Sequence, residues 1–192
     1  MNTRAIAIGL FAALSLAGLP GLSTAAEPGL DIAALRLATV GAWEGKLEYR
    51  DYQADRWFGL PMTVRIETPG DGVTLVRKAA FDDGPKTGTV WITTVELLDP
   101  ATGLETSAGF RKGRKPELDS ATLRLGAPAL DAAHWTLVSE TDGRDADRPA
   151  RLRVTTVRDG AVMTTLKEVD FLDDAGEAWI QRNRSSLTRI GD

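Results

Sequence analysis

The sequence contains no cysteine and only one histidine, His134, in 192 residues. Without cysteine, no disulfide can support the fold and no thiolate can bind a metal ion. With a single histidine, zinc and copper sites built from several imidazoles are excluded as well, which leaves carboxylates as the only other strong metal ligands. We therefore expect no metal site and no cofactor.

Long hydrophobic runs are also scarce, and the one present stands at the N-terminus. Arg4 is followed by an apolar stretch over residues 5–19, then by Pro20-Gly21 and a run of small residues. This order predicts a secretory signal peptide over residues 1–26. An uncleaved anchor is the alternative, but the run is shorter than the about 20 residues that a spanning helix needs. We expect a periplasmic or secreted protein, with no membrane span after removal of the signal peptide.

Charge of one sign is not in large excess. The formal net charge is −4, and basic residues alternate with acidic ones, as in the run of residues 144–148. Nucleic acid and anionic membrane surfaces call for a basic patch, so we expect neither as the main partner. Residues 27–192 are long enough for one domain with a substantial core.

Helical patterning is limited to residues 31–39, where Asp31 can cap a short helix that ends before Gly41. The remainder consists of about ten β-rich runs separated by turn residues. We expect them at residues 43–52, 61–68, 72–81, 88–98, 104–111, 118–125, 133–141, 150–158, 161–172 and 177–189. Asp159-Gly160 is the clearest tight hairpin and suits a type I′ turn.

Sequential hairpins predict an all-β antiparallel meander, which must close or split into two sheets to protect its edge strands. We favour a closed barrel of roughly eight to ten strands with one short N-terminal helix. Such a barrel leaves room for side chains plus one small ligand. Residues 126–131 and 142–149 are predicted to be the longest irregular loops, either at the barrel mouth or as solvated turns.

Gly41-Ala42-Trp43 follows the predicted helix and opens the first strand, and it resembles the Gly-x-Trp motif of the calycin group of β-barrels. The resemblance implies that Trp43 closes one end of the barrel and that a basic residue of the last strand packs across it. The last strand offers Arg182, Arg184 and Arg189, and we assign this structural role to Arg182 and Arg184 together with Gly41 and Trp43.

Within the calycin group, ten strands suit the fatty-acid-binding and nitrobindin-like barrels better than the eight-stranded lipocalins. By analogy, the resemblance implies that the barrel binds an apolar ligand. Nitrobindin-like barrels hold haem through a histidine close to the last strand, whereas His134 lies about three predicted strands before the end. We therefore expect no haem.

Strand alternation suggests which side chains line a cavity. Tyr49 lies on the face of the first strand that alternation predicts to be buried. Alternate residues of the predicted strands at 61–68 and 88–98 are expected to face the same interior. The predicted ligand-binding residues are Tyr49, Met62, Val64, Ile66, Trp91 and Thr93. The alternative is that these side chains simply fill the interior. A register slip of one residue would exchange the inner and outer faces.

No catalytic constellation is visible. The chain has no Gly-x-Ser-x-Gly elbow, and no pair of carboxylates stands out as a general acid and base. The sequence therefore favours a non-catalytic binding protein for a small apolar or amphipathic molecule. Two alternatives stay open: an envelope protein that binds another protein with a filled barrel, and a hydrolase or isomerase that uses Asp51, Tyr49 or His134 at the mouth.

Overall fold

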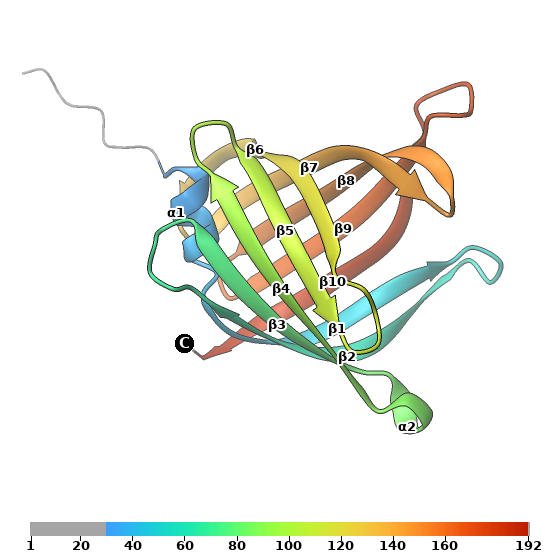
Figure 1. Cartoon of the computed structure of the whole chain (residues 1–192), viewed down its shortest axis with the longest axis horizontal. Coiled ribbons are helices and arrows are strands. Elements are labelled where there is room, and N and C mark those ends of the chain that lie inside the picture. The colour runs from blue at the N-terminus through green and yellow to red at the C-terminus, as the bar shows by residue number, and fades with distance from the viewer. Residues whose placement is uncertain (1–29, 192) are drawn as a thin grey trace, which may run out of the picture.

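The chain folds into a closed antiparallel barrel of ten strands, with a short helix across one end (Figure 1). The computed structural model describes residues 30–191, so the predicted signal peptide lies outside the described residues. The strands are β1 Gly41–Asp51, β2 Arg56–Glu67, β3 Thr74–Asp82, β4 Thr89–Asp99, β5 Leu104–Arg111, β6 Glu117–Asp131, β7 His134–Asp145, β8 Arg148–Asp159, β9 Val162–Phe171 and β10 Ile180–Gly191. The predicted all-β meander and its closure are confirmed.

The topology is the simplest that a ten-stranded barrel can have. Each strand pairs with its neighbour in sequence, and β1 pairs with β10 to close the barrel. Successive connections therefore alternate between two ends. One end carries helix α1 (Ile32–Leu37), and the other, which we call the distal end, carries the β1–β2, β5–β6, β7–β8 and β9–β10 hairpins and the one-turn helix α2 (Gly84–Thr87) (Figure 1). Within residues 30–191, no helix has the length and apolar character needed to cross a membrane.

Helix α1 forms where the sequence predicts it. The Asp31 carboxylate accepts a hydrogen bond from the Ala34 backbone N–H at 2.7 Å, which satisfies an N–H group left free at the helix start. Leu35 is wholly buried and packs against Trp135 and Leu137 of β7. This apolar contact holds the helix against the barrel and directs the next residue, Arg36, into the interior.

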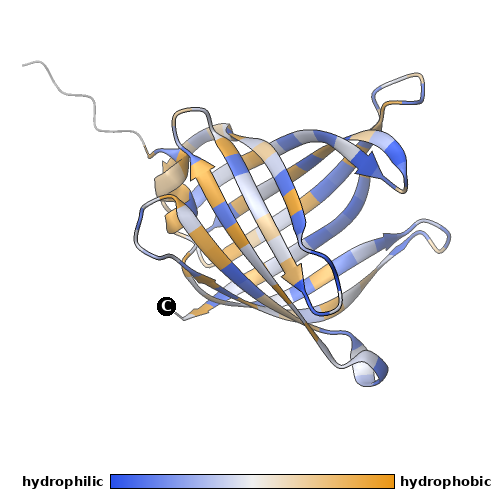
Figure 2. Ribbon diagram, in the orientation of Figure 1, coloured by the Kyte–Doolittle hydropathy of each residue, from blue (hydrophilic) through white to orange (hydrophobic). Residues whose placement is uncertain are grey.

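The apolar core lies toward the α1 end. Its largest cluster surrounds Trp43 and includes Met62, Val64, Ile66 and Leu75. In Figure 2 the apolar positions are concentrated near α1, whereas the distal hairpins are mainly hydrophilic. The barrel is therefore packed at one end and more polar at the other.

Three local predictions are wrong. Residues 126–131 belong to the irregular end of β6, where the register with β7 shifts, and residues 142–149 extend β7 and β8 almost to their turn. That turn consists of Ala146 and Asp147, both with positive φ, as a type I′ turn requires. The β8–β9 hairpin is tight as expected, but its turn residues are Gly160 and Ala161, and only Gly160 has a positive φ.

Candidate ligand cavity

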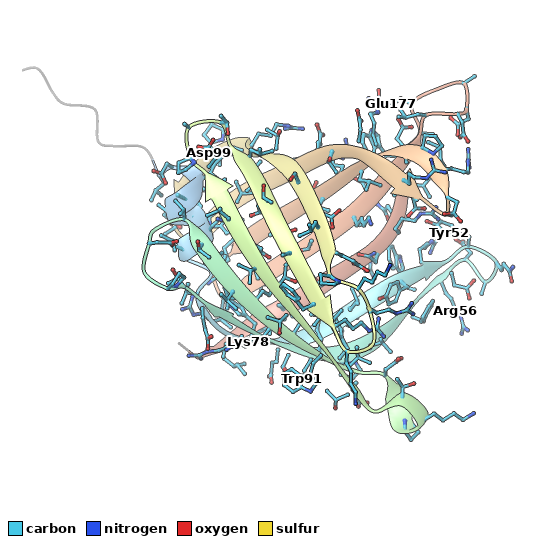
Figure 3. The ribbon with its side chains drawn as sticks, viewed as in Figure 1. Tyr52, Arg56, Lys78, Trp91, Asp99 and Glu177 are labelled. Atoms are coloured by element: carbon cyan, nitrogen blue, oxygen red, sulfur yellow. The ribbon has the colours of Figure 1, made fainter. Side chains whose placement is uncertain are left out.

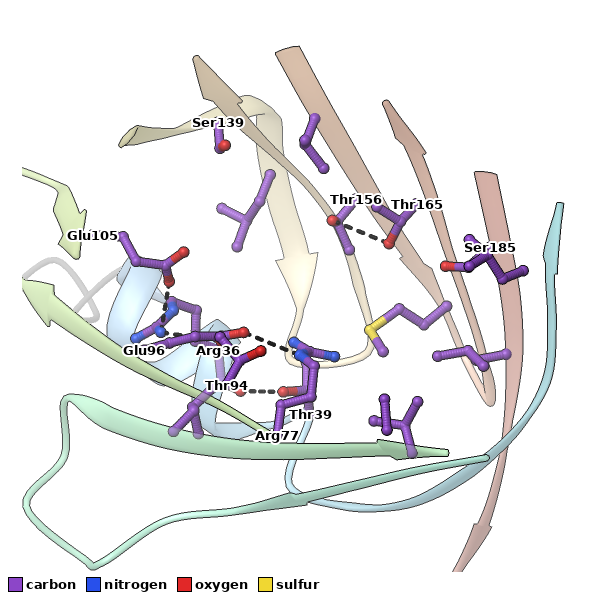
Figure 4. Close-up of a pocket in the computed structure, with 18 of the residues that line it drawn as sticks. Arg36, Thr39, Arg77, Thr94, Glu96, Glu105, Ser139, Thr156, Thr165 and Ser185 are labelled. Atoms are coloured by element: carbon purple, nitrogen blue, oxygen red, sulfur yellow. Dashed lines mark hydrogen bonds and ion pairs between the residues drawn. The ribbon is translucent and has the colours of Figure 1, made fainter. Parts of the chain in front are cut away.

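The barrel encloses a cavity of about 430 Å³. Every one of the ten strands contributes at least one inward-facing side chain to its lining, and α1 adds Arg36 from the end of the barrel (Figure 4). This volume lies within the range of small-molecule sites in proteins. The cavity follows from strand alternation, because the inward positions of ten strands enclose more space than their side chains fill.

One wall of the cavity is apolar. It is formed by side chains that also belong to the core cluster around Trp43, among them Met62, Val64, Leu75, Met163 and Leu187. A ligand resting on this wall would therefore extend the core of the protein. Burial of apolar ligand surface there contributes about 25 cal/mol per Å².

A group of four charged side chains lies at the α1 side of the cavity (Figure 4). Arg36 approaches Glu105 of β5 at 2.6 Å and Glu96 of β4 at 3.6 Å. The Arg77 guanidinium of β3 donates to the other oxygen of Glu96 at 3.0 Å. Arg36 also donates to the Val73 carbonyl at 3.0 Å. Each arginine thus already has a carboxylate partner.

The charges in this group influence one another strongly. Burial raises the pKa of Glu105, and the neighbouring Glu96 carboxylate raises it further, while Arg36 acts in the opposite direction. The negative charge of Glu96 raises the pKa of Arg77. Two guanidinium groups therefore face two carboxyl groups, and their charges compensate one another. This network can form hydrogen bonds with a ligand, but it presents no unpaired charge to it.

The remaining polar lining consists of hydroxyl groups. Thr94, Ser139, Thr156, Thr165 and Ser185 are distributed over five strands (Figure 4). The hydroxyl oxygens of Thr156 and Thr165 are 3.4 Å apart on neighbouring strands. Such hydroxyls can donate or accept, so this wall tolerates several orientations of a polar ligand group.

Trp43 seals the α1 end. Its side chain is wholly buried, and its indole N–H donates to the Thr39 carbonyl at 2.9 Å. The Arg158 guanidinium lies over the ring at 4.3 Å from the centroid, and the Arg189 guanidinium lies at 5.7 Å. Arg189 also donates to the Ala38 carbonyl at 3.1 Å and to the Val40 carbonyl at 2.6 Å, which ties β10 to the segment after α1.

The basic residue of the last strand that packs across Trp43 is therefore Arg189, and the assignment of Arg182 and Arg184 is wrong. Arg189 pairs in register with Trp43. Arg184 instead shares the outer face with Glu48, to which it donates at 2.8 Å. Arg182 forms an ion pair with Asp145 and lies near the Tyr52 and Phe171 rings.

Gly41 has a physical reason to be glycine. It has a φ of 139°, and a Cβ there would lie 2.7 Å from the Gly191 carbonyl oxygen and 2.9 Å from the Arg189 guanidinium. The absence of a side chain at position 41 therefore gives Arg189 its path to Trp43. This contact explains the spacing of glycine and tryptophan in the motif.

The predicted cavity residues are distributed over four places, of which three are inside the barrel. Met62 and Val64 line the cavity. Ile66 is wholly buried beyond it, in the cluster around Trp43. Tyr49 lies toward the distal end, where its ring stacks on Phe58 at 5.7 Å and both line a second pocket of about 390 Å³.

The prediction for β4 is wrong by one residue. Trp91 is 62 % exposed on the outside of the barrel (Figure 3), and Thr93 shares its face. Ile92, Thr94 and Glu96 line the cavity instead. Both faces of β4 carry apolar side chains, so alternation alone does not distinguish inside from outside.

Sequence reasoning did not single out the four charged residues of the cavity. The alternation of β4 contained a usable signal, since Glu96 falls on the same face as Ile92 and Thr94. A glutamate in an alternating pattern normally indicates that its face of the strand is exposed to solvent. Glu96 faces the interior instead, where Arg36 and Arg77 compensate its charge.

The residues considered for catalysis occupy structural positions. His134 lies outside the cavity lining, and its Nδ1 is 2.8 Å from the Asp131 carboxylate at the β6–β7 turn. Asp51 accepts hydrogen bonds from the backbone N–H groups of Gln53 and Ala54 and so shapes the β1–β2 turn. Among residues 30–191, no group of three or more histidine, cysteine, aspartate or glutamate side chains could hold a metal ion.

No protein-family model and no curated protein matches the chain. Solved structures do resemble it. Rv2717c from M. tuberculosis is 14 % identical, with a TM-score of 0.54 over 82 % of this chain and 97 % of that chain. A protein of unknown function of the DUF3598 family from Nostoc punctiforme is 9 % identical over 82 % and 98 %, with a TM-score of 0.24. The likeness to Rv2717c shows a shared fold.

Proposed function

We propose that this protein is a non-catalytic binding protein that holds a small apolar or amphipathic molecule inside its barrel. The observation that carries the proposal is the cavity of about 430 Å³, with an apolar wall on one side and compensated charges and hydroxyls on the other. Ligand sites typically combine a mainly apolar lining with a few convergent polar groups.

The proposal includes a calycin-like mode of binding at a location outside the cytoplasm. The sealed α1 end, with Trp43 beneath Arg158 and Arg189, supports a barrel that admits its ligand from the distal end. The N-terminal sequence over residues 1–26 supports export to the periplasm or the medium. A ligand carrier in that compartment would need no cysteine, because its stability comes from the core.

The test is native mass spectrometry of the mature protein, purified from the periplasm without detergent, followed by titration with the neutral probe N-phenyl-1-naphthylamine. We expect either a mass excess that disappears on denaturation or saturable probe fluorescence. Thr156→Phe, which fills the cavity, should weaken probe binding at least about fivefold. Thr155→Phe is the matched control, because Thr155 lies next to it on the outer face of β8.

Both variants should keep a cooperative thermal transition, which shows that any loss of binding is local. A protein that carries no ligand and takes up no probe would overturn the proposal. Equal probe binding by the Thr156→Phe and Thr155→Phe variants would also overturn it, because the probe would then not occupy the barrel.

A second candidate function is docking of a partner protein with a matching apolar, uncharged surface. The outer faces of β4, β5 and β6 carry exposed apolar side chains, namely Trp91, Leu97, Leu104, Phe110 and Leu118. The outer faces of β8 and β9 carry ion pairs instead, such as Arg153 with Glu168. Trp91→Lys should then abolish recovery of a stoichiometric partner while leaving probe binding intact.

A further inference from the structure

Lys167 is placed at the rim of the cavity. It lies on β9 two residues after Thr165, which lines the cavity, and it pairs across the sheet with Val154, another lining residue of β8. Because β9 runs from the α1 end toward the distal end, Lys167 stands on the distal side of Thr165. Its side chain faces inward, as alternation from Thr165 requires.

Lys167 differs in its partners from three other cations on the inner face, whereas Arg158, which also forms no ion pair among residues 30–191, is buried over Trp43 at the closed end. Arg36 and Arg77 are engaged by Glu105 and Glu96, and Arg182 is engaged by Asp145. Within the described part of the chain, no ion pair involves Lys167.

The surroundings of Lys167 supply no negative charge from the adjacent strands. Its cross-strand neighbours are Val154 on β8 and Asn183 on β10, both uncharged. The inward positions of β8 and β10 on either side carry Leu152, Thr156, Ser185 and Ile180. Lys167 as a whole residue is half-buried, and a cation without a carboxylate partner beside a cavity favours binding of an anion.

The same end of the barrel carries a strongly basic hairpin. Arg111 ends β5, and the connection to β6 contains Lys112, Arg114 and Lys115; none of the four forms an ion pair with another residue in the range 30–191. Arg111 lines the distal pocket, which shares Leu47, Phe81 and Ile92 with the cavity. The two pockets therefore adjoin each other, and the basic hairpin lies beside the second one.

The acidic side chains of the distal end form no ion pair with Lys167 among the described residues. Asp51 lies 3.9 Å from Arg56, and Asp145 is paired with Arg182. Asp83 lines the same pocket as Arg111, and Glu117 pairs with Gly109 of β5, so both belong to parts of the barrel that do not adjoin β9.

We propose that the ligand is an amphipathic anion, bound with its apolar part against the cavity wall and its single negative group at Lys167. This inference rests on the proposed function and adds the charge and the orientation of the ligand. The reverse orientation would bring the anion to Arg36 and Arg77, where Glu96 and Glu105 already occupy the guanidinium groups and would repel it. The basic hairpin would raise the rate at which such an anion enters.

The test uses three ligands with the same ten-carbon chain and different charge: decanoate, decan-1-ol and decylammonium. Each is titrated against the mature protein carrying N-phenyl-1-naphthylamine, and displacement gives the dissociation constant. We expect the affinity to fall in the order decanoate, decanol, decylammonium. Lys167→Met should weaken decanoate about tenfold, as for a charge-assisted hydrogen bond, and change decanol less than about twofold.

Lys78→Met is the matched control, because Lys78 lies on the outer face of β3 and pairs with Glu67. Lys167→Glu should move the preference toward decylammonium. If all three ligands displace the probe equally, and Lys167→Met changes none of them, the assignment of the anion to Lys167 is overturned while the barrel remains a binding site. If the probe itself never enters the barrel, the proposed function fails first.

Discussion

Arginine residues of one strand serve different purposes according to which face of the barrel they occupy. Arg189 points inward beside Trp43 and holds two backbone carbonyls of the segment after α1. Arg184 points outward, pairs with Glu48 and lies over the Trp57 ring at 4.3 Å. The first arrangement is partly buried beside the core, and in the second Arg184 is exposed while Glu48 is buried. Their contributions to stability should therefore differ.

Arg189→Met should lower the free energy of unfolding by about 2 kcal/mol, because two backbone carbonyls lose a charged donor in a partly buried site. Arg184→Met should cost less than about 1 kcal/mol, because Arg184 is exposed and Lys46, 2.8 Å from Glu48, still compensates that carboxylate. Urea denaturation of both variants and of the wild type provides the comparison. Equal losses for the two variants would contradict the role assigned to Arg189.

The sequence predicted that Trp43 is covered by a basic residue of the last strand, but it did not predict which residue this is. Gly41, Trp43 and a basic partner on the last strand could be named, since the motif is local. Arg184 and Arg189 lie five residues apart in a regular part of β10 and therefore face opposite sides, so the choice between them depends on which face of the strand is the inner one. The register shift between Gln181 and Asn183 decides only the position of Arg182, and it leaves no pattern in the sequence.

For strands with one polar face and one apolar face, the inner face was predicted correctly. In β1, Trp43 and Leu47 lie on the inner face that alternation predicts, and Met62 and Val64 of β2 do the same, while Glu48 on the outer face of β1 is buried as well. β4 failed because Trp91 and Leu97 on its outer face are as apolar as Ile92 and Leu98 on its inner face. Alternation identifies a strand in such a case without identifying its inner side.

The connection between β9 and β10 is held by one buried carboxylate. Asp170 is almost wholly buried, accepts the Ala178 backbone N–H at 2.7 Å, and accepts the Arg151 guanidinium at 3.0 Å. The Ala178 hydrogen bond, followed by the Arg151 guanidinium, lowers the pKa of Asp170 below its ordinary value. Trp179 then lies over Arg153, at 3.8 Å from the guanidinium carbon to the ring centroid.

This carboxylate should make the protein sensitive to acid. Because the pKa is lower in the folded state than in the unfolded state, its contribution to stability is present above about pH 4 and is lost as the pH falls through the folded value. Asp170→Asn should therefore be less stable than the wild type at pH 7, and the difference should shrink below about pH 4.

Urea denaturation between pH 2 and pH 7 would measure this effect, with Asp119→Asn, an exposed residue of β6, as the control. A constant difference between Asp170→Asn and the wild type over the whole range would show that ionisation of Asp170 does not stabilise the loop.

At the scale of the whole molecule, closure protects the sheet. β1 and β10 are far apart in the sequence, and their pairing removes both edges of the sheet. The charged group of the cavity is also assembled between elements, because Arg77, Glu96 and Glu105 come from the neighbouring strands β3, β4 and β5 and helix α1 adds Arg36 from the end of the barrel. The sequence could predict that a meander of this length closes, but the charged group depends on contacts between elements that no local pattern records.

The closing seam between β1 and β10 depends on a close approach at Gly45. A Cβ built at Gly45 would lie 1.9 Å from the Ser186 backbone carbonyl oxygen, which is not part of a flexible side chain and cannot move alone. At Gly143 of β7, by contrast, the nearest atom to an added Cβ is the Leu152 Cδ1 methyl at 3.1 Å, which can rotate away. The two glycines therefore provide a matched pair for testing closure.

Gly45→Ala should cost about 3 kcal/mol or more, because the backbones of β1 and β10 must separate to admit the methyl group. Gly143→Ala should cost less than about 1 kcal/mol. Hydrogen exchange would show where the loss occurs: in Gly45→Ala the amides of β1 and β10 should exchange first, while those of β4 and β5 keep most of their protection. Uniform exchange through all ten strands would instead mean that the barrel opens only by global unfolding, and that its seam is no weaker than any other pair of strands.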